Sequence, residues 1–166
     1  AYFKDTIKTL NMRAAVFYGP GNIVNKENYL TSINNKNRIA LKLKACAVCG
    51  YDVRVFRNGH SKVTPPIILG HEICGEITKD VYSGLGGKEI LLKAGTRVTV
   101  SPIVPCMRCR YCGRNEYNLC LHLREIGSSI NGGFAEYINI PTQLVKIGGL
   151  VPVPDNINDD EAALLE

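Results

Sequence analysis

Four cysteines in one short segment constrain this chain more than any other feature. They follow the pattern Cys-x2-Cys-x2-Cys-x7-Cys within fifteen residues, at Cys106, Cys109, Cys112 and Cys120. Zinc in a structural site takes four tetrahedral ligands, and four thiolates satisfy it completely. A disulfide pair or an iron–sulfur cluster is the rival interpretation, but the spacing departs from the ferredoxin pattern. We therefore predict a closed zinc site that stabilises the fold and performs no chemistry.

The arginines of this segment and the total number of cysteines support that interpretation. A tetrathiolate zinc centre carries two net negative charges, so we expect Arg108, Arg110 and Arg114 to help hold the thiolates deprotonated. The chain has 7 cysteines in all, and an odd, clustered set argues against a disulfide framework. We therefore expect metal-bound thiolates in a reducing, cytoplasmic compartment.

Composition narrows the class of protein. The chain has 166 residues, of which 45% are hydrophobic and 21% charged, which indicates one globular domain and not a disordered chain. No apolar run reaches the roughly 20 residues that a membrane span needs. The net charge of +5 is too small to indicate nucleic-acid binding by itself. We therefore expect neither a membrane nor a nucleic-acid partner.

Short apolar segments separated by glycine and proline predict a mainly β fold. Many short strands at this spacing are typical of a barrel or a sandwich. Residues 1–11 show no clean period, and we expect them to be a leader or residues added for expression, with Met12 as the native start. The expected strands comprise residues 13–18, 39–43, 67–69, 73–77, 97–100, 134–140 and 144–147.

Two short helices are also expected. Cys49 precedes residues 51–56, which can begin a helix, and a helix N-terminus lowers the pKa of a thiol. Asp52 lies in the first turn of that helix, where a negative charge is favourable. A hydrogen bond from Asp52 that orients a neighbouring residue is an equally good interpretation. Asn158 and Glu161 have the spacing of a capping box, ahead of a run of Ala and Leu. Because the sequence stops inside this second helix, we treat the chain as a fragment.

A second candidate metal group combines Cys49 with His71 and Glu72. One thiolate, one imidazole and one carboxylate leave a position open for water or substrate, as a catalytic zinc site requires. The spacing is weak evidence by itself, and a single histidine is more often a hydrogen-bonded structural residue. We expect Cys46 and Cys74 to be buried in the core, where a cysteine acts as a small apolar side chain. The rival is a closed structural site formed by Cys46, Cys49, His71 and Cys74.

Five motifs occur in order along the chain: VCGYD, GHEICGEI, AGTRVTVSPIVPCMRCRYCGRNEYNLC, GGFAEYINIP and DDEAALLE. Together they resemble the zinc-dependent medium-chain alcohol dehydrogenases, in the branch that contains sorbitol and threonine dehydrogenases. The resemblance runs from Met12 to Glu166. It implies a GroES-like catalytic domain over residues 12–166, which is a partly open β-barrel with short helices and a zinc-binding lobe. It also implies a nicotinamide-binding Rossmann domain that is absent from this chain.

The resemblance implies roles for individual residues. Cys49 and His71 would be ligands of a catalytic zinc, with Glu72 as the adjacent carboxylate. Glu166 would be a further carboxylate at the zinc, bound directly or through water. The structural zinc lobe of the family matches Cys106, Cys109, Cys112 and Cys120.

The implied reaction is oxidation of a small alcohol or polyol. Zinc would stabilise the alkoxide so that a hydride can leave for NAD or NADP, held by the missing domain. The full-length protein would also associate with copies of itself. We expect this chain alone to bind metal without turning over, because hydride transfer needs the nicotinamide against the reacting carbon.

Three features depart from the family pattern. Tyr51 stands where the family usually has Ser or Thr as first member of a proton relay, and Arg54 stands where it often has His. A phenol can pass a proton, whereas an arginine stays protonated, so His60 is a speculative substitute. Residues 80–92 are expected to be a loop insertion. The altered relay and the missing cofactor domain favour the rival hypothesis, which is a binding module that zinc stabilises and that performs no catalysis.

Overall fold

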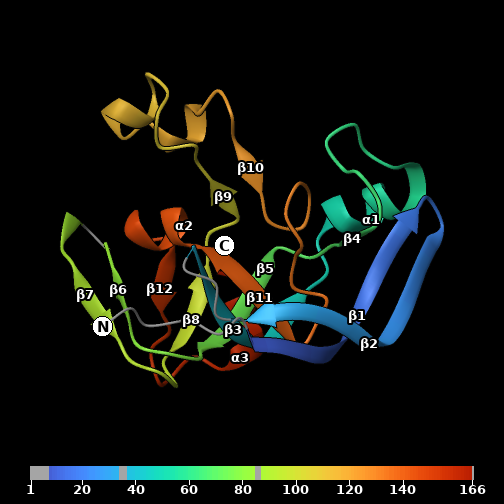
Figure 1. Ribbon diagram of the computed structural model, residues 1–166, viewed down its shortest axis with the longest axis horizontal. Coiled ribbons are helices and arrows are strands. Elements are labelled where there is room, and N and C mark those ends of the chain that lie inside the picture. Colours follow the sequence, from blue (N-terminus) through green and yellow to red (C-terminus); the bar gives the residue numbers. More distant parts are fainter. Residues whose placement is uncertain (1–7, 34–36, 85–86, 166) are drawn as a thin grey trace.

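A five-stranded antiparallel sheet forms the centre of the molecule (Figure 1). The computed structural model describes residues 8–33, 37–84 and 87–165. Alternate residues along the strands, such as Leu41, Ile73 and Val98, are buried in the main core. The strands lie in the order β11 (Tyr137–Pro141), β3 (Arg38–Ala47), β5 (Glu72–Ile77), β8 (Arg97–Val100) and β12 (Leu150–Pro152).

A second sheet has the order β2-β1-β4 and consists largely of a long antiparallel ribbon. The predicted strand at 13–18 is confirmed, but β1 begins earlier, so residues 8–11 of the expected leader belong to it. The sequence does not predict β2, because its apolar residues Ile23, Val24 and Leu30 are scattered among polar ones and exposed. The three strands are β1 (Lys8–Gly19), β2 (Asn22–Ile33) and β4 (Ile67–Ile68).

The four clustered cysteines lie in a lobe that projects from the central sheet, at the top of Figure 1. Two short strands that pair with each other lead into and out of the lobe. Between them the chain forms two turns of 3-10 helix. These elements are β9 (Ile103–Val104), η2 (Cys112–Arg114), η3 (Tyr117–Leu119) and β10 (Arg124–Glu125).

The expected strand at 144–147 is wrong, because this segment belongs to the short helix α2 (Thr142–Lys146). Leu144 and Val145 are both buried, whereas adjacent residues of a strand point to opposite faces. Gly148, with φ of 81°, ends the turn, and the strand follows as β12. The apolar pattern could not separate a strand from a helix here, since three apolar residues in a segment of four fit either element.

The expected loop insertion at 80–92 is also corrected, because it contains a β-hairpin. β6 (Val81–Ser83) pairs antiparallel with β7 (Ile90–Leu92). The buried Ser83 hydroxyl donates a hydrogen bond to the Val145 carbonyl over 3.1 Å. The hairpin is therefore attached to α2.

Both predicted helices are confirmed. α1 (Gly50–Asn58) begins after Cys49, and α3 (Asp159–Ala163) begins after Asn158 with a complete capping box. Asp159 pairs with Arg97 of β8 over 2.9 Å, and Ala162 and Ala163 pack against Cys74. Within the described ranges, every helix is too short or too polar to cross a membrane. The expectation of a mainly β chain with short helices is thus confirmed.

Candidate metal centres

The lobe brings its four sulfur atoms to the distances that one zinc ion requires. The Sγ atoms of Cys109 and Cys112 lie 3.6 Å apart, and those of Cys106 and Cys112 lie 4.0 Å apart. Cys109 and Cys120 also have their Sγ atoms 4.0 Å apart. A tetrahedral zinc with bonds of about 2.3 Å places its sulfurs about 3.8 Å from one another. All four cysteines are free of disulfides, so the donor set fits zinc.

Backbone N–H groups favour the thiolate form within the lobe. They hold the pKa of Cys106 below its usual range and lower that of Cys109 to about 6. The amide of Cys106 donates a hydrogen bond to Cys120 Sγ over 3.2 Å. Burial, with hydrogen bonds among the thiols, raises the pKa of Cys112 to about 11. Metal ligation requires deprotonated thiols, so a cation bound here would displace the protons that remain.

Two arginines of the lobe contact neighbouring side chains, and the expected effect of the three arginines on the thiolates stays a prediction. The Arg110 guanidinium donates to the Tyr111 hydroxyl over 3.0 Å and lies 4.8 Å from its ring centre. Arg114 pairs with Glu116 over 2.8 Å. Both side chains thus bind neighbours within the lobe, and the N–H groups of the tight turns stabilise the thiolates. The pattern of charges in the sequence does not reveal these backbone contacts.

A second group of potential ligands forms where α1 approaches the start of β5. It consists of Cys49, Asp52 and His71, each of which has a ligand atom within 4.8 Å of the others. Cys49 is the N-cap of α1, and His71 immediately precedes β5. The predicted convergence of Cys49 and His71 is therefore present. Thiolate, imidazole and carboxylate are all ligands that zinc takes in open sites, so this donor set also fits the metal.

Asp52 connects the two ligand segments. It is 3% exposed, and its Oδ2 accepts a hydrogen bond from the Cys49 amide over 3.0 Å. Its Oδ1 accepts one from the Gly70 amide over 3.1 Å and lies 3.9 Å from His71 Nδ1. One buried carboxylate thus fixes the start of α1 relative to the loop that carries His71. The sequence indicates two roles for Asp52, in the first turn of α1 and as a hydrogen-bond partner that orients a neighbour. In the structure Asp52 has both roles.

The loop that precedes His71 is held by close backbone packing. Gly70 has φ of 89°, which a glycine adopts without strain. The amide of Gly132 donates to the Ile68 carbonyl over 2.7 Å, and that of Gly133 donates to the Gly70 carbonyl over 2.9 Å. A Cβ atom on Gly132 would lie only 2.1 Å from the Gly70 oxygen. The glycines at 132 and 133 therefore allow the contact that positions His71.

A pocket of about 270 Å³ adjoins this second group. Tyr51 and His71 line it, with their ring centres 5.6 Å apart in an edge contact. The Tyr51 hydroxyl donates to Ser128 Oγ over 3.1 Å, and Ser128 lines the same pocket. Sequence reasoning missed Ser128, because a serine in a loop carries no signal of its own. The remaining lining residues are Pro102, Ile103, Glu125 and Ile126.

The structure describes one of the two predicted glutamates. Glu72 is the first residue of β5 and is half-buried, but among the described residues the clustered carboxylate is that of Asp52. The role of Glu72 at the metal therefore stays a prediction. Glu166 lies outside the described residues.

The other two cysteines outside the lobe lie apart from the second ligand group, and His60 and Arg54 contact Tyr51. Burial raises the pKa of Cys46 to about 12 and that of Cys74 to about 11. Neither belongs to a group of close ligand atoms in the described ranges, so a closed site with three cysteines and one histidine does not form there. His60 and Arg54 both contact the Tyr51 ring. The ring centres of His60 and Tyr51 lie 5.4 Å apart, and the Arg54 Cζ atom lies 5.8 Å from the Tyr51 ring centre.

Comparison with known proteins places this geometry in context. Residues 35–155 match the alcohol dehydrogenase GroES-like domain. Sorbitol dehydrogenase of Bacillus subtilis is 33% identical over 160 residues, which cover 94% of this chain and 42% of that protein. L-galactonate-5-dehydrogenase of Escherichia coli K12 is also 33% identical, over 155 residues that cover 93% of this chain and 42% of that enzyme.

A solved structure shares the fold. It is an alcohol dehydrogenase of Escherichia coli CFT073 in complex with NADH, with a TM-score of 0.72 and 25% identity over 93% of this chain and 42% of that one. The chain thus spans less than half the length of these three proteins.

Proposed function

The chain belongs to the zinc-dependent medium-chain alcohol dehydrogenase family, in the branch of sorbitol and threonine dehydrogenases, and from this premise we propose its activity. Residues 12–166 are the GroES-like catalytic domain of an NAD(P)-dependent dehydrogenase that oxidises a small alcohol or polyol. The observation that carries this proposal is the approach of Cys49 and His71, from separate segments, beside a pocket.

Two zinc ions with different roles follow from the two donor sets. The four cysteines of the lobe hold a structural ion and leave no open position. Cys49 and His71 hold the catalytic ion, with Asp52 beside them and with Glu72 and Glu166 as proposed further carboxylates. When bound there, zinc supplies Lewis-acid polarisation of an alcohol hydroxyl and lowers the hydroxyl pKa toward about 7.

Other residues of the chain orient the metal ligands and accept the proton that the substrate hydroxyl loses. Asp52 holds Cys49 and the His71 loop in place through its two hydrogen bonds to backbone amides, as buried carboxylates next to metal ligands commonly do. Tyr51 and Ser128 form a hydrogen-bonded pair of hydroxyls in the pocket. We assign proton transfer from the substrate to this pair, in place of the Ser or Thr that the family usually has.

Hydride transfer requires a nicotinamide, which a further domain of a longer protein would hold. The relatives named above are more than twice the length of the matched region, which supports this arrangement. The 166-residue chain should therefore bind zinc without oxidising alcohols. All of its cysteines are free, which supports a cytoplasmic location. We also propose that the full-length protein is a homo-oligomer.

Metal analysis of the purified chain tests this proposal. The wild-type chain should contain two zinc ions, and His71→Ala should contain one while keeping its circular dichroism spectrum. His122→Ala is the matched control, because His122 lies outside both groups of ligand atoms, and it should keep both ions. Two ions in His71→Ala would exclude His71 as a ligand. Production of NADH or NADPH by the chain alone would contradict the requirement for a further domain.

A further inference from the structure

The pocket of about 270 Å³ beside His71 contains one polar group that the proposed chemistry does not use. The apolar lining residues of this pocket are Pro102, Ile103 and Ile126. Its polar lining residues are Tyr51, His71, Glu125 and Ser128. His71 is a proposed metal ligand, and Tyr51 and Ser128 are the proposed pair for proton transfer. This leaves Glu125 as a carboxylate in the pocket wall without a role.

The backbone of Glu125 is fixed by the turn that follows it. Its carbonyl oxygen accepts hydrogen bonds from the amides of Ser129 over 3.0 Å and Ile130 over 3.1 Å. Its own amide donates to Ser129 Oγ over 2.9 Å. Ile103, its partner across the β9–β10 pair, lines the same pocket. The side chain of Glu125 therefore starts from a well-defined position beside the pocket.

Lys62 offsets the charge of Glu125 only in part. The Lys62 Nζ atom lies 3.7 Å from Glu125 Oε2, and the lysine side chain is 64% exposed, against 33% for the glutamate. Water and salt screen such an exposed ion pair, so it contributes little. Of the two side chains, it is Glu125 that lines the pocket. A molecule bound in the pocket therefore meets the negative charge first.

A carboxylate in so small a pocket discriminates by charge. An ionised carboxyl group accepts hydrogen bonds and donates none, so it can bind the hydroxyl groups of a polyol that do not react. A second negative charge inside the pocket would lie close to Glu125 and be repelled, which is how a like charge rejects a wrong ligand. The pocket thus favours a neutral molecule with several hydroxyl groups over an acid or a phosphate ester.

We propose that Glu125 is a specificity-determining residue that selects neutral polyols and disfavours anionic substrates. Its carboxylate accepts hydrogen bonds from substrate hydroxyl groups other than the one that reacts. This inference rests on the proposed function, because it takes the pocket beside Cys49 and His71 as the place where the substrate binds. It narrows that function from a small alcohol or polyol to an uncharged polyol.

Sorbitol and gluconate test the proposal, because they share one carbon chain and differ in a single end group, a hydroxymethyl group or a carboxylate. Each is titrated into the zinc-loaded 166-residue chain, and amide chemical shifts in NMR give its affinity at the pocket. Glu125→Gln should move the ratio of sorbitol to gluconate affinity about tenfold toward gluconate. Attraction between the gluconate carboxylate and zinc is common to both chains and cancels in this comparison.

Glu76→Gln is the matched control. Glu76 also lies 3.7 Å from a lysine, Lys44, and its side chain is 37% exposed, but it lies on β5 outside the pocket lining. This variant should keep the wild-type ratio. Lys62→Gln removes the partial counter-charge and should move the ratio the opposite way, toward sorbitol.

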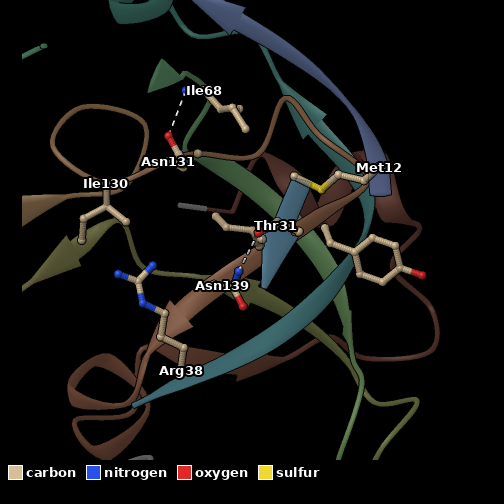
Figure 2. A pocket seen from close by; sticks show the side chains of 10 residues that line it. Met12, Thr31, Arg38, Ile68, Ile130, Asn131 and Asn139 are labelled. Carbon is tan, nitrogen blue, oxygen red and sulfur yellow. Dashed lines mark hydrogen bonds between the residues drawn. The ribbon is translucent and has the colours of Figure 1, made fainter. Parts of the chain in front are cut away.

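Shift mapping also separates the pocket from a second cavity, between β3 and β11, where Arg38 could attract an anion (Figure 2). Among the described residues, the two share no lining residue. Gluconate shifts around Arg38 are therefore not counted as binding at the pocket.

The outcomes distinguish this proposal from the proposed function. An unchanged affinity ratio in Glu125→Gln, with sorbitol bound at the pocket, would overturn the role of Glu125 alone. Sorbitol shifts that persist undiminished in His71→Ala would instead contradict a zinc-dependent substrate site. A wild-type chain whose pocket amides do not respond to sorbitol would overturn both.

Discussion

The two groups of metal ligands are assembled in opposite ways. The lobe takes all four sulfurs from one segment of fifteen residues, 106–120, with Sγ distances of 3.6 to 4.0 Å. The second group takes Cys49 from the start of α1 and His71 from the loop before β5. Asp52, the Gly70 turn and Gly132 bring these two segments together. The first site depends on local spacing, whereas the second depends on the tertiary fold.

This difference separates what each ion contributes. A closed tetrathiolate site contributes its binding free energy to folding, because the unfolded chain has no preformed site for the ion. In the second group, buried hydrogen bonds and backbone packing hold the ligand residues together without help from a metal ion. Removing a ligand from the lobe should therefore affect stability most, and disturbing the second group should affect metal occupancy most.

Cys112→Ser should give the largest effect. Losing one ligand leaves the lobe with three thiols where a closed zinc site needs four ligands, so the structural zinc should be lost. We expect the melting temperature to fall by about 10 °C or more, as measured by calorimetry. Cys46→Ala is the matched control, because Cys46 is a partly buried cysteine outside both ligand groups. If both variants lose equal stability and equal zinc, the lobe is not a metal site.

Gly132→Ala should disturb the second group and leave the lobe unchanged. The added methyl would collide with the Gly70 carbonyl and displace the loop that carries His71. Overpacking of this kind costs about 1–3 kcal/mol of unfolding free energy, and one of two zinc ions should bind more weakly. Gly113→Ala is the control within the lobe, because nothing lies within 4 Å of the position that an added Cβ would take there. Equal zinc retention in both variants would contradict this assignment.

Asp52→Asn should weaken the second site with a smaller effect on stability. The amide keeps one acceptor oxygen but turns an NH₂ group toward either the Cys49 or the Gly70 amide. Zinc affinity at that site should fall about 10–100-fold, as measured by competition with a chelator. Asp160→Asn changes an exposed carboxylate on α3 and should have no effect. An unchanged affinity in Asp52→Asn would show that the carboxylate does not support the ligands.

Glu136→Gln should give the smallest effect and alter neither metal site. Hydrogen bonds from the Arg13 amide and guanidinium hold the pKa of Glu136 below its ordinary value of 4.5. Glu136 therefore stabilises the fold at pH above 4.5, and the stabilisation is lost as pH falls through the lowered value. At pH 7 the melting temperature of the wild type should be slightly higher than that of the variant, and this difference should disappear on acidification. A difference that widens in acid would contradict this sign.

Features with a local cause could be predicted from the sequence. The four-cysteine spacing and the Asn158 capping box each depend on residues close in the chain, and both correspond to structures described above. α1 is likewise recognisable from the residues that follow Cys49. The spacing of Cys49 and His71 is weak evidence for a shared site, and the resemblance to a family supplies the tertiary relation that spacing does not contain.

Features that depend on packing could not be predicted. The sequence predicts a strand where α2 lies, because a short apolar run does not reveal its period. It does not identify Asp52 as the carboxylate of the second group, because the two hydrogen bonds of Asp52 reach residues on different segments. The backbone N–H groups that stabilise the lobe thiolates are equally invisible in a pattern of side chains.

Anomalous scattering at the zinc edge, from crystals of the wild-type chain, tests the central claim most directly. Two peaks are expected, one surrounded by the four sulfurs of the lobe and the other between Cys49 Sγ and the His71 ring. A single peak in the lobe, with no metal density beside Cys49 and His71, would contradict the assignment of a catalytic ion.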